Sequence, residues 1–293
     1  MTIPTSDSPS NPAPIKVAVL DLYDGEENQG MRAIRELLTD ADGAFYGLPL
    51  HFQIYETRLK DELPGLNHDI YLSSGGPGSP FDGEGKAWER HYFEWLDTLW
   101  NHNQQHPASE TKHALFICHS FQMMCRFFEV AQVTKRRSES FGIFPVHKTE
   151  AGFQDPLFEP LSEPFYAADF RKWQVVQPDA QRLADLGAQV LACEKIRHHV
   201  PLERATMAIR ISPEIVGVQF HPEADPPGMK KHFKDPKRRA FIARHHGQEK
   251  YDRIIHRLED PTFLKRTHDV FIPTFLRQAI ETLRPACVAM KDA

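Results

Sequence analysis

Short apolar strands alternate with amphipathic helices along the first half of the chain, and this alternation restricts the folds open to it. The run KVAVLDLY at residues 16–23 is apolar on both faces, which is typical of a strand buried on both sides of a sheet. Strand-like segments recur at residues 69–74 and 114–118, with helix-like stretches between the strands. This order predicts an α/β fold with a mostly parallel sheet flanked by helices.

The pattern changes in the second half of the chain. Over residues 133–220, short β-like pieces are broken by Pro and Gly, which predicts an antiparallel or mixed extension of the sheet. Helical charge patterns dominate nearer the C-terminus. We therefore expect a disordered leader at residues 1–14, one catalytic domain at residues 15–225 and a helical C-terminal extension at residues 226–293.

Composition narrows the classes of protein to which the chain can belong. Its four cysteines lie far apart without a CxxC pair, which argues against a disulfide framework and a zinc ribbon and favours the cytoplasm. No apolar stretch is long enough to span a bilayer, and the N-terminus lacks the pattern of a secretory signal, so we expect no membrane association. The sixteen histidines show no ligand spacing, and we expect neither a metal nor a cofactor.

Two motifs directly follow predicted strands, whose carboxyl ends line the ligand crevice of a parallel sheet. In SGGPGSP, the paired glycines Gly75 and Gly76 let backbone N–H groups approach a ligand, although the motif alone is more typical of an ordinary turn. In FICHSFQ, an apolar strand ends at Cys118 and a helix begins at once. Such a turn exposes the thiol and lowers its pKa, whereas most cysteines in apolar runs are core residues.

A third motif, VGVQFHPEAD, is another apolar strand, and it ends in His221 with Glu223 two residues later. A histidine in this place can take the proton of a thiol while the carboxylate orients the ring. A lone histidine is more often a satisfied surface group, but here the ends of three strands converge. We therefore expect Cys118, His221 and Glu223 to form a catalytic triad.

SGGPGSP, ICHSFQ and QFHPE, in this order and spacing, resemble the three signatures of class I glutamine amidotransferases. The resemblance covers roughly residues 15–223 and implies a flavodoxin-like sheet. It also implies a thioester route, in which Cys118 attacks a γ-amide or γ-glutamyl carbonyl, His221 shuttles protons and Glu223 orients His221. It further implies an oxyanion hole formed by the backbone N–H groups of Gly76 and His119.

The same resemblance implies which residues hold the substrate. Gln122 matches a position that helps to bind glutamine, and Gly75 lies beside the implied oxyanion hole. In residues 169–176, DFRKWQVV stands where amidotransferases usually carry a His-Gly-Asp-like stretch. Because this stretch gains cations, we expect Arg171 and Trp173 to bind a substrate that is more anionic than glutamine.

Two further positions depart from the family pattern around the nucleophile. The family usually has glycine two residues before and two residues after the cysteine, because a tight turn leaves little room for side chains. Here these positions hold Phe116 and Ser120. We expect a slightly more open turn that still presents the thiol.

The charge of the chain is uneven. Its net charge is −5, yet residues 230–257 hold ten Lys/Arg against three Asp/Glu. We expect this basic segment to lie over the mouth of the active site and to attract an anionic substrate or an acidic partner. A solvated pair of helices that only covers the sheet is the alternative, and binding of nucleic acid is a weaker one.

Three functions fit these features. The first is a glutaminase subunit that acts on a small-molecule substrate and passes ammonia to a separate synthetase, since the chain has no GxxxxGK[ST] loop of its own. The second is a stand-alone γ-glutamyl hydrolase or acyltransferase that uses the same triad on a more anionic substrate. The third is a binding or regulatory protein without turnover, and the intact triad argues against it.

Overall fold

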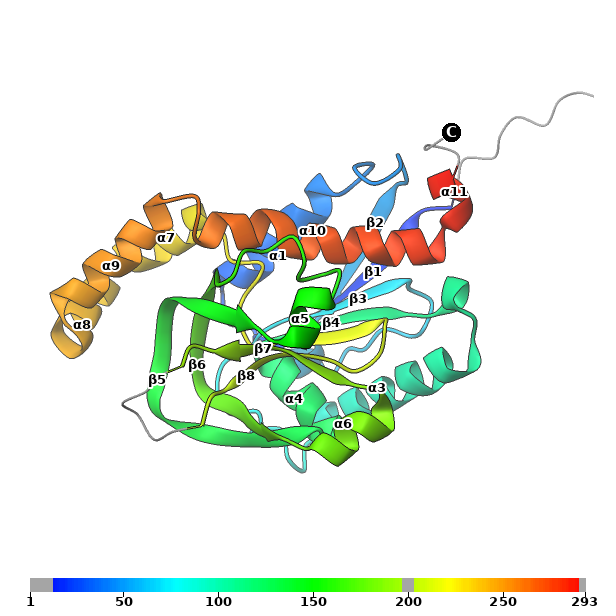
Figure 1. Cartoon of the computed structure of the whole chain (residues 1–293), viewed down its shortest axis with the longest axis horizontal. Helices are drawn as coiled ribbons and strands as arrows, with labels where there is room; N and C mark the ends of the chain where they lie inside the picture. The colour runs from blue at the N-terminus through cyan, green and yellow to red at the C-terminus, as the bar shows by residue number, and fades with distance from the viewer. Residues whose placement is uncertain (1–12, 197–202, 290–293) are drawn as a thin grey trace, which may run out of the picture.

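One mixed sheet runs through the molecule, with helices on both of its faces (Figure 1). The computed structural model describes residues 13–196 and 203–289, so most of the predicted leader at residues 1–14 lies outside the described part. The strands are β1 (Ile15–Leu20), β2 (Leu50–Tyr55), β3 (Ile70–Ser73), β4 (His113–Ile117), β5 (Ala131–Lys148), β6 (Phe165–Pro178), β7 (Gln189–Glu194), β8 (Thr206–Arg210) and β9 (Ile215–Val218).

The helices lie between the strands and at the C-terminal end of the described residues. They are α1 (Gln29–Asp40), α2 (Thr57–Lys60), α3 (Ala87–Gln105), α4 (His119–Phe128), α5 (Glu150–Gln154), α6 (Ala180–Leu186), α7 (Pro226–Lys234), α8 (Pro236–His246), α9 (Gln248–Glu259), α10 (Leu264–Leu283) and α11 (Pro285–Ala289). A 3₁₀ turn at Ala108–Glu110 precedes β4. None of the described helices is long and apolar enough to cross a bilayer.

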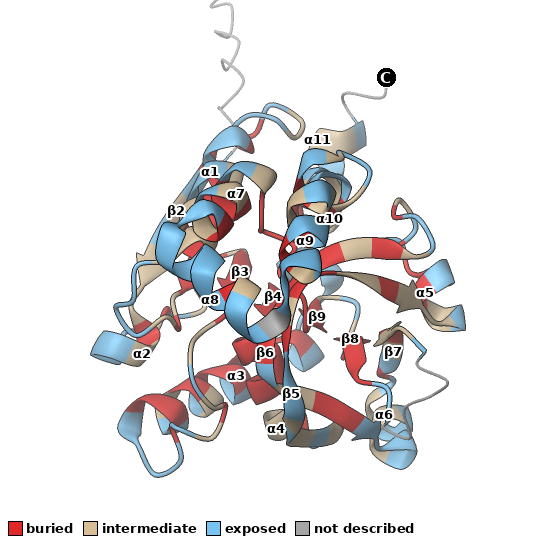
Figure 2. Cartoon of the chain, turned by 90° about the vertical axis from the view of Figure 1, so that its left-hand side faces the viewer, coloured by how far each residue is buried: buried red, intermediate tan, exposed pale blue. Residues whose placement is uncertain are grey.

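The first half of the sheet is parallel, in the order β2-β1-β3-β4-β9. Side chains that alternate along β1 enter different cores. Val17 and Val19 pack in the layer of α1 and α10, whereas Ala18 and Leu20 pack in the layer of α3 and α4. Burial of both faces explains why this strand is apolar throughout, and the strands form the buried centre of Figure 2.

The second half of the sheet is antiparallel and closes on itself. β8, β6, β5 and β7 are neighbours in this order, and β7 also pairs with β8, so the four strands form a ring. β9 joins the halves, because it is parallel to β4 and antiparallel to β8.

The predicted flavodoxin-like, mostly parallel sheet is therefore not confirmed for the molecule as a whole, because its parallel order ends at β9, whereas the predicted antiparallel or mixed extension is confirmed. Parallel neighbours need a crossover of a dozen or more residues. The connection between β8 and β9 spans only residues 211–214, which is too short for one.

The C-terminal helices pack at two different places. α7, α8 and α9 cover the outside of β5 and β6, where Phe233 and Ile254 share an apolar cluster with Ile143 and Ala168. α10 then crosses back over the parallel half and contributes Phe271 and other apolar side chains to the same core as α1. The boundary at residue 225 stays a prediction, but α10 belongs to the core of the sheet.

Candidate active site

Cys118 occupies a sharp turn between β4 and α4. Its backbone has φ 52° and ψ −97°, a conformation that residues with a side chain rarely adopt. The Cys118 N–H donates to the carbonyl of Val218 at 2.7 Å, which ties the turn to the end of β9. The turn therefore holds the thiol at the carboxyl edge of the parallel strands, next to the segment that carries the proposed base.

Ser120 stabilises this turn instead of opening it. Its hydroxyl accepts a hydrogen bond from the N–H of Ile117 at 2.8 Å and donates to the carbonyl of Ser73 at 2.7 Å. Phe116 is fully buried in the core of the α3 layer. The departures from the two family glycines are thus accommodated, and Ser120 links the turn to β3.

His221 and Glu223 form a buried pair beside the thiol. The ring nitrogen Nδ1 of His221 lies 2.8 Å from Oε1 of Glu223, and the His221 N–H donates to the carbonyl of Ala168 in β6 at 2.9 Å. Glu223 is almost completely buried. Both the ring and the backbone of His221 are consequently fixed.

The electrostatic surroundings of His221 favour its charged form. Burial alone lowers the pKa of His221, but the neighbouring charges of Glu223 and Cys118, and hydrogen bonds to both, raise that pKa well above its ordinary value of 6.5. A protonated imidazole next to a cysteine stabilises the thiolate. The three residues can therefore act as an ion pair with an orienting carboxylate.

The glycine motif lies directly against this pair. A Cβ on Gly75 would come within 2.9 Å of Cε1 of His221, and one on Gly76 would meet the carbonyl oxygen of Leu22 at 2.5 Å. Neither position can hold a side chain without displacing the site. The loop after β3 can thus bring its backbone close to a bound carbonyl group.

His119 is the first residue of α4, whose opening N–H groups have no partner within the helix. Its side chain is buried, and burial lowers the pKa of His119 to about 3. The ring is therefore neutral at physiological pH. The backbone of His119, rather than its side chain, suits the role predicted for it.

Gln122 is linked to the thiol through Gln219. Its Nε2 donates to Oε1 of Gln219 at 3.0 Å and to the carbonyl of Trp173 at 3.2 Å. Gln219 in turn places its Nε2 3.7 Å from Sγ of Cys118. Gln122 thus connects α4 with β6 and with the segment after β9.

The two residues predicted in β6 have different surroundings. The ring of Trp173 packs against Phe81, with 5.1 Å between ring centroids, so it lies next to the loop after β3. Arg171 points to the interior of the antiparallel ring, where its Nε donates to Asp169 at 2.8 Å and its Nη2 lies 3.8 Å from Glu194. The structure does not bring Arg171 to the thiol.

Strand alternation explains the position of Arg171. The preceding residue, Phe170, faces the active site, because its carbonyl lies 3.9 Å from Sγ of Cys118 and its ring centroid 6.1 Å from that of His221. Successive side chains of a strand point to opposite faces. The cation predicted to bind the substrate therefore forms ion pairs in the barrel interior instead.

Helix α7 forms one wall beside the site. The ring centroid of His232 lies 6.1 Å from that of Phe170, which contacts His221 on its other side. Burial and the nearby Arg238 lower the pKa of His232 to about 4, so its ring is neutral. An ion pair between Arg32 of α1 and Asp225 anchors the start of α7.

Three residues of the site are not among those predicted, although Gln219 belongs to the QFHPE motif and Phe170 to the DFRKWQVV segment. Phe170 and Gln219 contact the thiol, and Tyr23 follows β1 at the same edge of the sheet. A Cβ on Gly75 would lie 3.1 Å from the Tyr23 hydroxyl. Burial, together with Glu223, raises the pKa of Tyr23 well above 10, so the hydroxyl remains protonated. The position of Tyr23 just after a strand is the sequence feature that could have indicated this residue.

Solved structures share this architecture. No family model and no curated protein matches the sequence. A glutamine amidotransferase from Thermotoga maritima has a TM-score of 0.62 and 15% sequence identity, over 92% of this chain and 97% of that one. The chain has the fold of glutamine amidotransferases.

A second solved structure with this amidotransferase fold is the glutaminase domain of CTPS from Trypanosoma brucei with bound acivicin. It has a TM-score of 0.53 and 13% identity, over 78% of this chain and 92% of that domain. The resemblance carried by the three motifs is confirmed at the level of the fold.

In the described part of the chain, no group of three or more His, Cys, Asp or Glu residues could hold a metal ion.

Proposed function

We propose that the chain is a cysteine-dependent amidohydrolase that cleaves a γ-glutamyl amide through a thioester on Cys118. The observation that carries this proposal is the position of Cys118, in a sharp turn beside the buried His221–Glu223 pair. The fold shared with glutamine amidotransferases supports the same class of reaction. A nucleophile, a base and an orienting group are the parts that such a reaction needs.

The first half of the reaction forms the thioester. The thiolate of Cys118 attacks the carbonyl carbon, and the carbonyl oxygen takes the negative charge. Backbone N–H groups of Gly76 and His119 are proposed to stabilise this oxyanion. When the intermediate collapses, the C–N bond breaks and the imidazolium of His221 gives its proton to the leaving ammonia or amine.

The second half releases the acid. His221, now neutral, takes a proton from a water molecule, which attacks the thioester carbon. The C–S bond breaks, the glutamyl product leaves as a carboxylic acid that gives its proton to solvent, and the thiolate–imidazolium pair is restored. Glu223 keeps the ring of His221 in one orientation through both halves.

We assign the remaining predicted residues to positioning. Gly75 gives the substrate close access to the backbone beside His221, and Gln122 holds the carbonyl of Trp173 near the site. Trp173 is proposed to pack against the bound substrate together with Phe81. Arg171 is left out of this set, since its guanidinium pairs with Asp169 inside the barrel.

A substrate more anionic than glutamine is a second candidate, and α7 favours it. This helix lies beside Phe170 and carries Lys230, Lys231 and Lys234. These lysines, rather than Arg171, are the cations that could select an anionic γ-glutamyl compound. A stand-alone γ-glutamyl hydrolase or acyltransferase would need such selection.

Transfer of ammonia to a separate synthetase is a third arrangement. Two solved neighbours are described as a subunit of a GMP synthase and as the glutaminase domain of CTPS, and thus as parts of larger enzymes. By analogy, we propose that release of ammonia from glutamine would require a partner protein. If the isolated chain releases little ammonia from glutamine, that result would agree both with a preference for a more anionic substrate and with a need for a partner protein.

Labelling with acivicin tests the proposed nucleophile. We expect intact-mass spectrometry to detect a single adduct on the wild-type chain and on Cys193→Ala, and none on Cys118→Ala. His221→Ala should slow the labelling strongly, because its thiol lacks a base. The proposal would be contradicted if another cysteine were labelled. It would also be contradicted if no adduct formed and no amine were released from glutamine or γ-glutamyl peptides, and a binding protein would then be the remaining function.

A further inference from the structure

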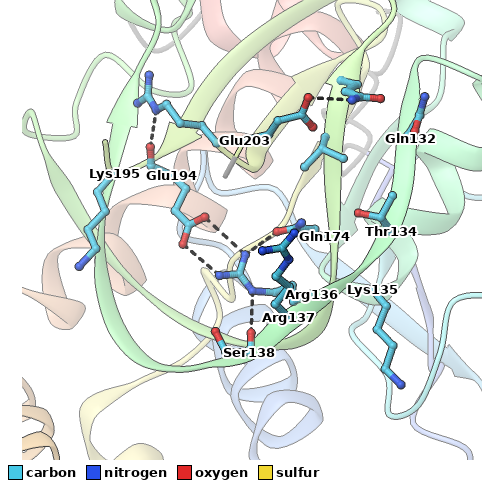
Figure 3. A pocket seen from close by; sticks show the side chains of 13 residues that line it. Gln132, Thr134, Lys135, Arg136, Arg137, Ser138, Gln174, Glu194, Lys195 and Glu203 are labelled. Carbon is cyan, nitrogen blue, oxygen red and sulfur yellow. Dashed lines mark hydrogen bonds and ion pairs between the residues drawn. The ribbon is translucent and has the colours of Figure 1, made fainter. Parts of the chain in front are cut away.

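A pocket opens at the antiparallel ring, and it contains none of the residues assigned to the chemistry above. It has a volume of about 290 Å³ and lies between the start of β5, the end of β6, the end of β7 and the residues just before β8 (Figure 3). We call it the barrel-end pocket. Its cationic lining residues are Lys135, Arg136, Arg137, Lys195 and Arg204.

Positive charge dominates the barrel-end pocket. Besides the five cations, its lining holds two carboxylates, Glu194 and Glu203, which leaves a formal charge of +3 in a chain whose net charge is −5. Glu203 accepts a hydrogen bond from Gln177 at 2.7 Å. Lys135 and Arg137 have no ion-pair partner within residues 13–196 and 203–289.

Arg136 lies at the centre of the pocket, as Figure 3 shows, and its side chain is only 7% exposed. Its Nη1 donates to Oε1 of Gln174 at 2.7 Å, and its Nη2 lies 3.3 Å from Oε1 of Glu194. These contacts fix the guanidinium plane. An oxyanion that approaches it meets a preformed donor rather than a mobile side chain.

A second guanidinium lies behind the first. Arg171 shares Glu194 with Arg136, and its side chain is 1% exposed. Its Nη1 is buried without a hydrogen-bond partner in the described part of the chain. Burial lowers the pKa of Arg136, and the like charge of Arg171 lowers it further. Two carboxylates, Glu194 and Asp169, thus pair with the two neighbouring guanidinium groups, but one donor of Arg171 stays without a partner among the described residues.

We propose that the barrel-end pocket binds a small molecule with a multiply charged oxyanion group, either a phosphate or clustered carboxylates. Guanidinium groups bind both by paired charge-assisted hydrogen bonds. The volume is at the lower limit of pockets for small ligands, which suits a compact anion. Polar side chains such as Thr134, Ser138 and Gln174 complete the lining.

Titration calorimetry at constant ionic strength tests this site, with inorganic pyrophosphate and citrate as probes. We expect saturable 1:1 binding of at least one probe to the full chain, and the stronger probe identifies the oxyanion. The double variant Lys135→Gln/Arg137→Gln should weaken binding about 10- to 100-fold, because it removes two exposed cations without leaving a buried charge unpaired. Thermal unfolding of the variant should be unchanged.

The control variant Lys237→Gln/Arg277→Gln removes two exposed cations from α8 and α10 and should bind the probes like the wild type. Arg136→Lys keeps the charge but loses the planar fork, so it should also weaken binding. No saturable binding of either probe, or an equal loss in the control variant, would overturn the proposal. The measurement needs no turnover, and with Cys118→Ala it is independent of the proposed reaction.

Discussion

Cys118 holds a backbone conformation that its own side chain disfavours. A residue other than glycine in such a conformation costs about 1–3 kcal/mol and persists only where its surroundings over-determine it. Here the surroundings are the hydrogen bonds from the Cys118 N–H to Val218 and from Ser120 to Ile117 and Ser73. The strain is thus located at the residue that is proposed to react.

This strain predicts different stabilities for two inactive variants. Cys118→Ala keeps a Cβ in the disfavoured conformation, whereas Cys118→Gly removes it. We expect the glycine variant to have a free energy of unfolding about 1–2 kcal/mol higher than the alanine variant, measured by urea denaturation. Neither variant should turn over substrate. Equal unfolding midpoints would show that the turn is not strained.

The His221–Glu223 pair predicts a shift in the pH profile. At alkaline pH, His221 loses the proton that the leaving amine needs, so kcat/KM falls. Glu223 raises the pKa of His221, and Glu223→Gln should therefore move the alkaline limb of the profile to lower pH. Glu249→Gln, at an exposed position on α9, serves as the control and should leave the limb in place.

The same pair predicts an order of kinetic losses. His221→Ala should lower kcat about 10⁴- to 10⁶-fold, because it removes the general acid and base. Glu223→Gln should also lower kcat, but by a factor about 10- to 100-fold smaller than that of His221→Ala, since the ring stays in place. A loss at Glu223 no larger than that at Glu249 would remove Glu223 from the proposed triad.

At the scale of an element, α7 has a position that bears on the substrate. It is anchored to α1 by the Arg32–Asp225 ion pair and contacts Phe170 through His232. The basic helix α7 therefore lies beside the candidate site. The expectation that residues 230–257 cover the mouth of the site with their charges stays a prediction. Their charge can raise the local concentration of an anionic substrate.

Ionic strength separates attraction of the substrate from a purely structural role of α7. For an anionic γ-glutamyl substrate, kcat/KM of the wild type should fall as salt is added. The variant with Lys230, Lys231 and Lys234 changed to Gln should start about 10-fold lower and respond less to salt. Arg277→Gln, which changes an exposed cation on α10, is the control. Identical salt curves for wild type and triple variant would leave only the structural role.

The sequence predicted the elements better than the direction of individual side chains. Two-sided apolar runs indicated β1, β3, β4 and β9, and the motifs at their ends identified the residues of the proposed triad. Arg171 was misplaced because a shift of one residue in a strand exchanges its two faces, and sequence alone does not fix the register of β6. Phe170 contacts the thiol of a distant segment, for which no local pattern exists, whereas the position of Tyr23 after β1 could have indicated that residue.

For the whole molecule, β9 is the joint between the two halves of the sheet. It pairs with β4 on one side and with β8 on the other, and His221 follows it. Loss of this strand would separate the thiol from its base and the parallel half from the ring. We expect the labelling rate of Cys118 and the far-UV circular dichroism to decline together in urea. A thiol that loses its reactivity well before the helices unfold would contradict this coupling.

The pairing of β4 with β9 also sets when the site can exist during synthesis of the chain. Gln219, which contacts the thiol, is 101 residues further along than Cys118. At about 5–20 residues per second, the ribosome takes roughly 5–20 s to make this stretch. Until then Cys118 is an ordinary thiol without a base, and β4 exposes an unpaired edge. A nascent chain therefore cannot carry out the reaction before the strand that precedes His221 has emerged and inserted beside β4.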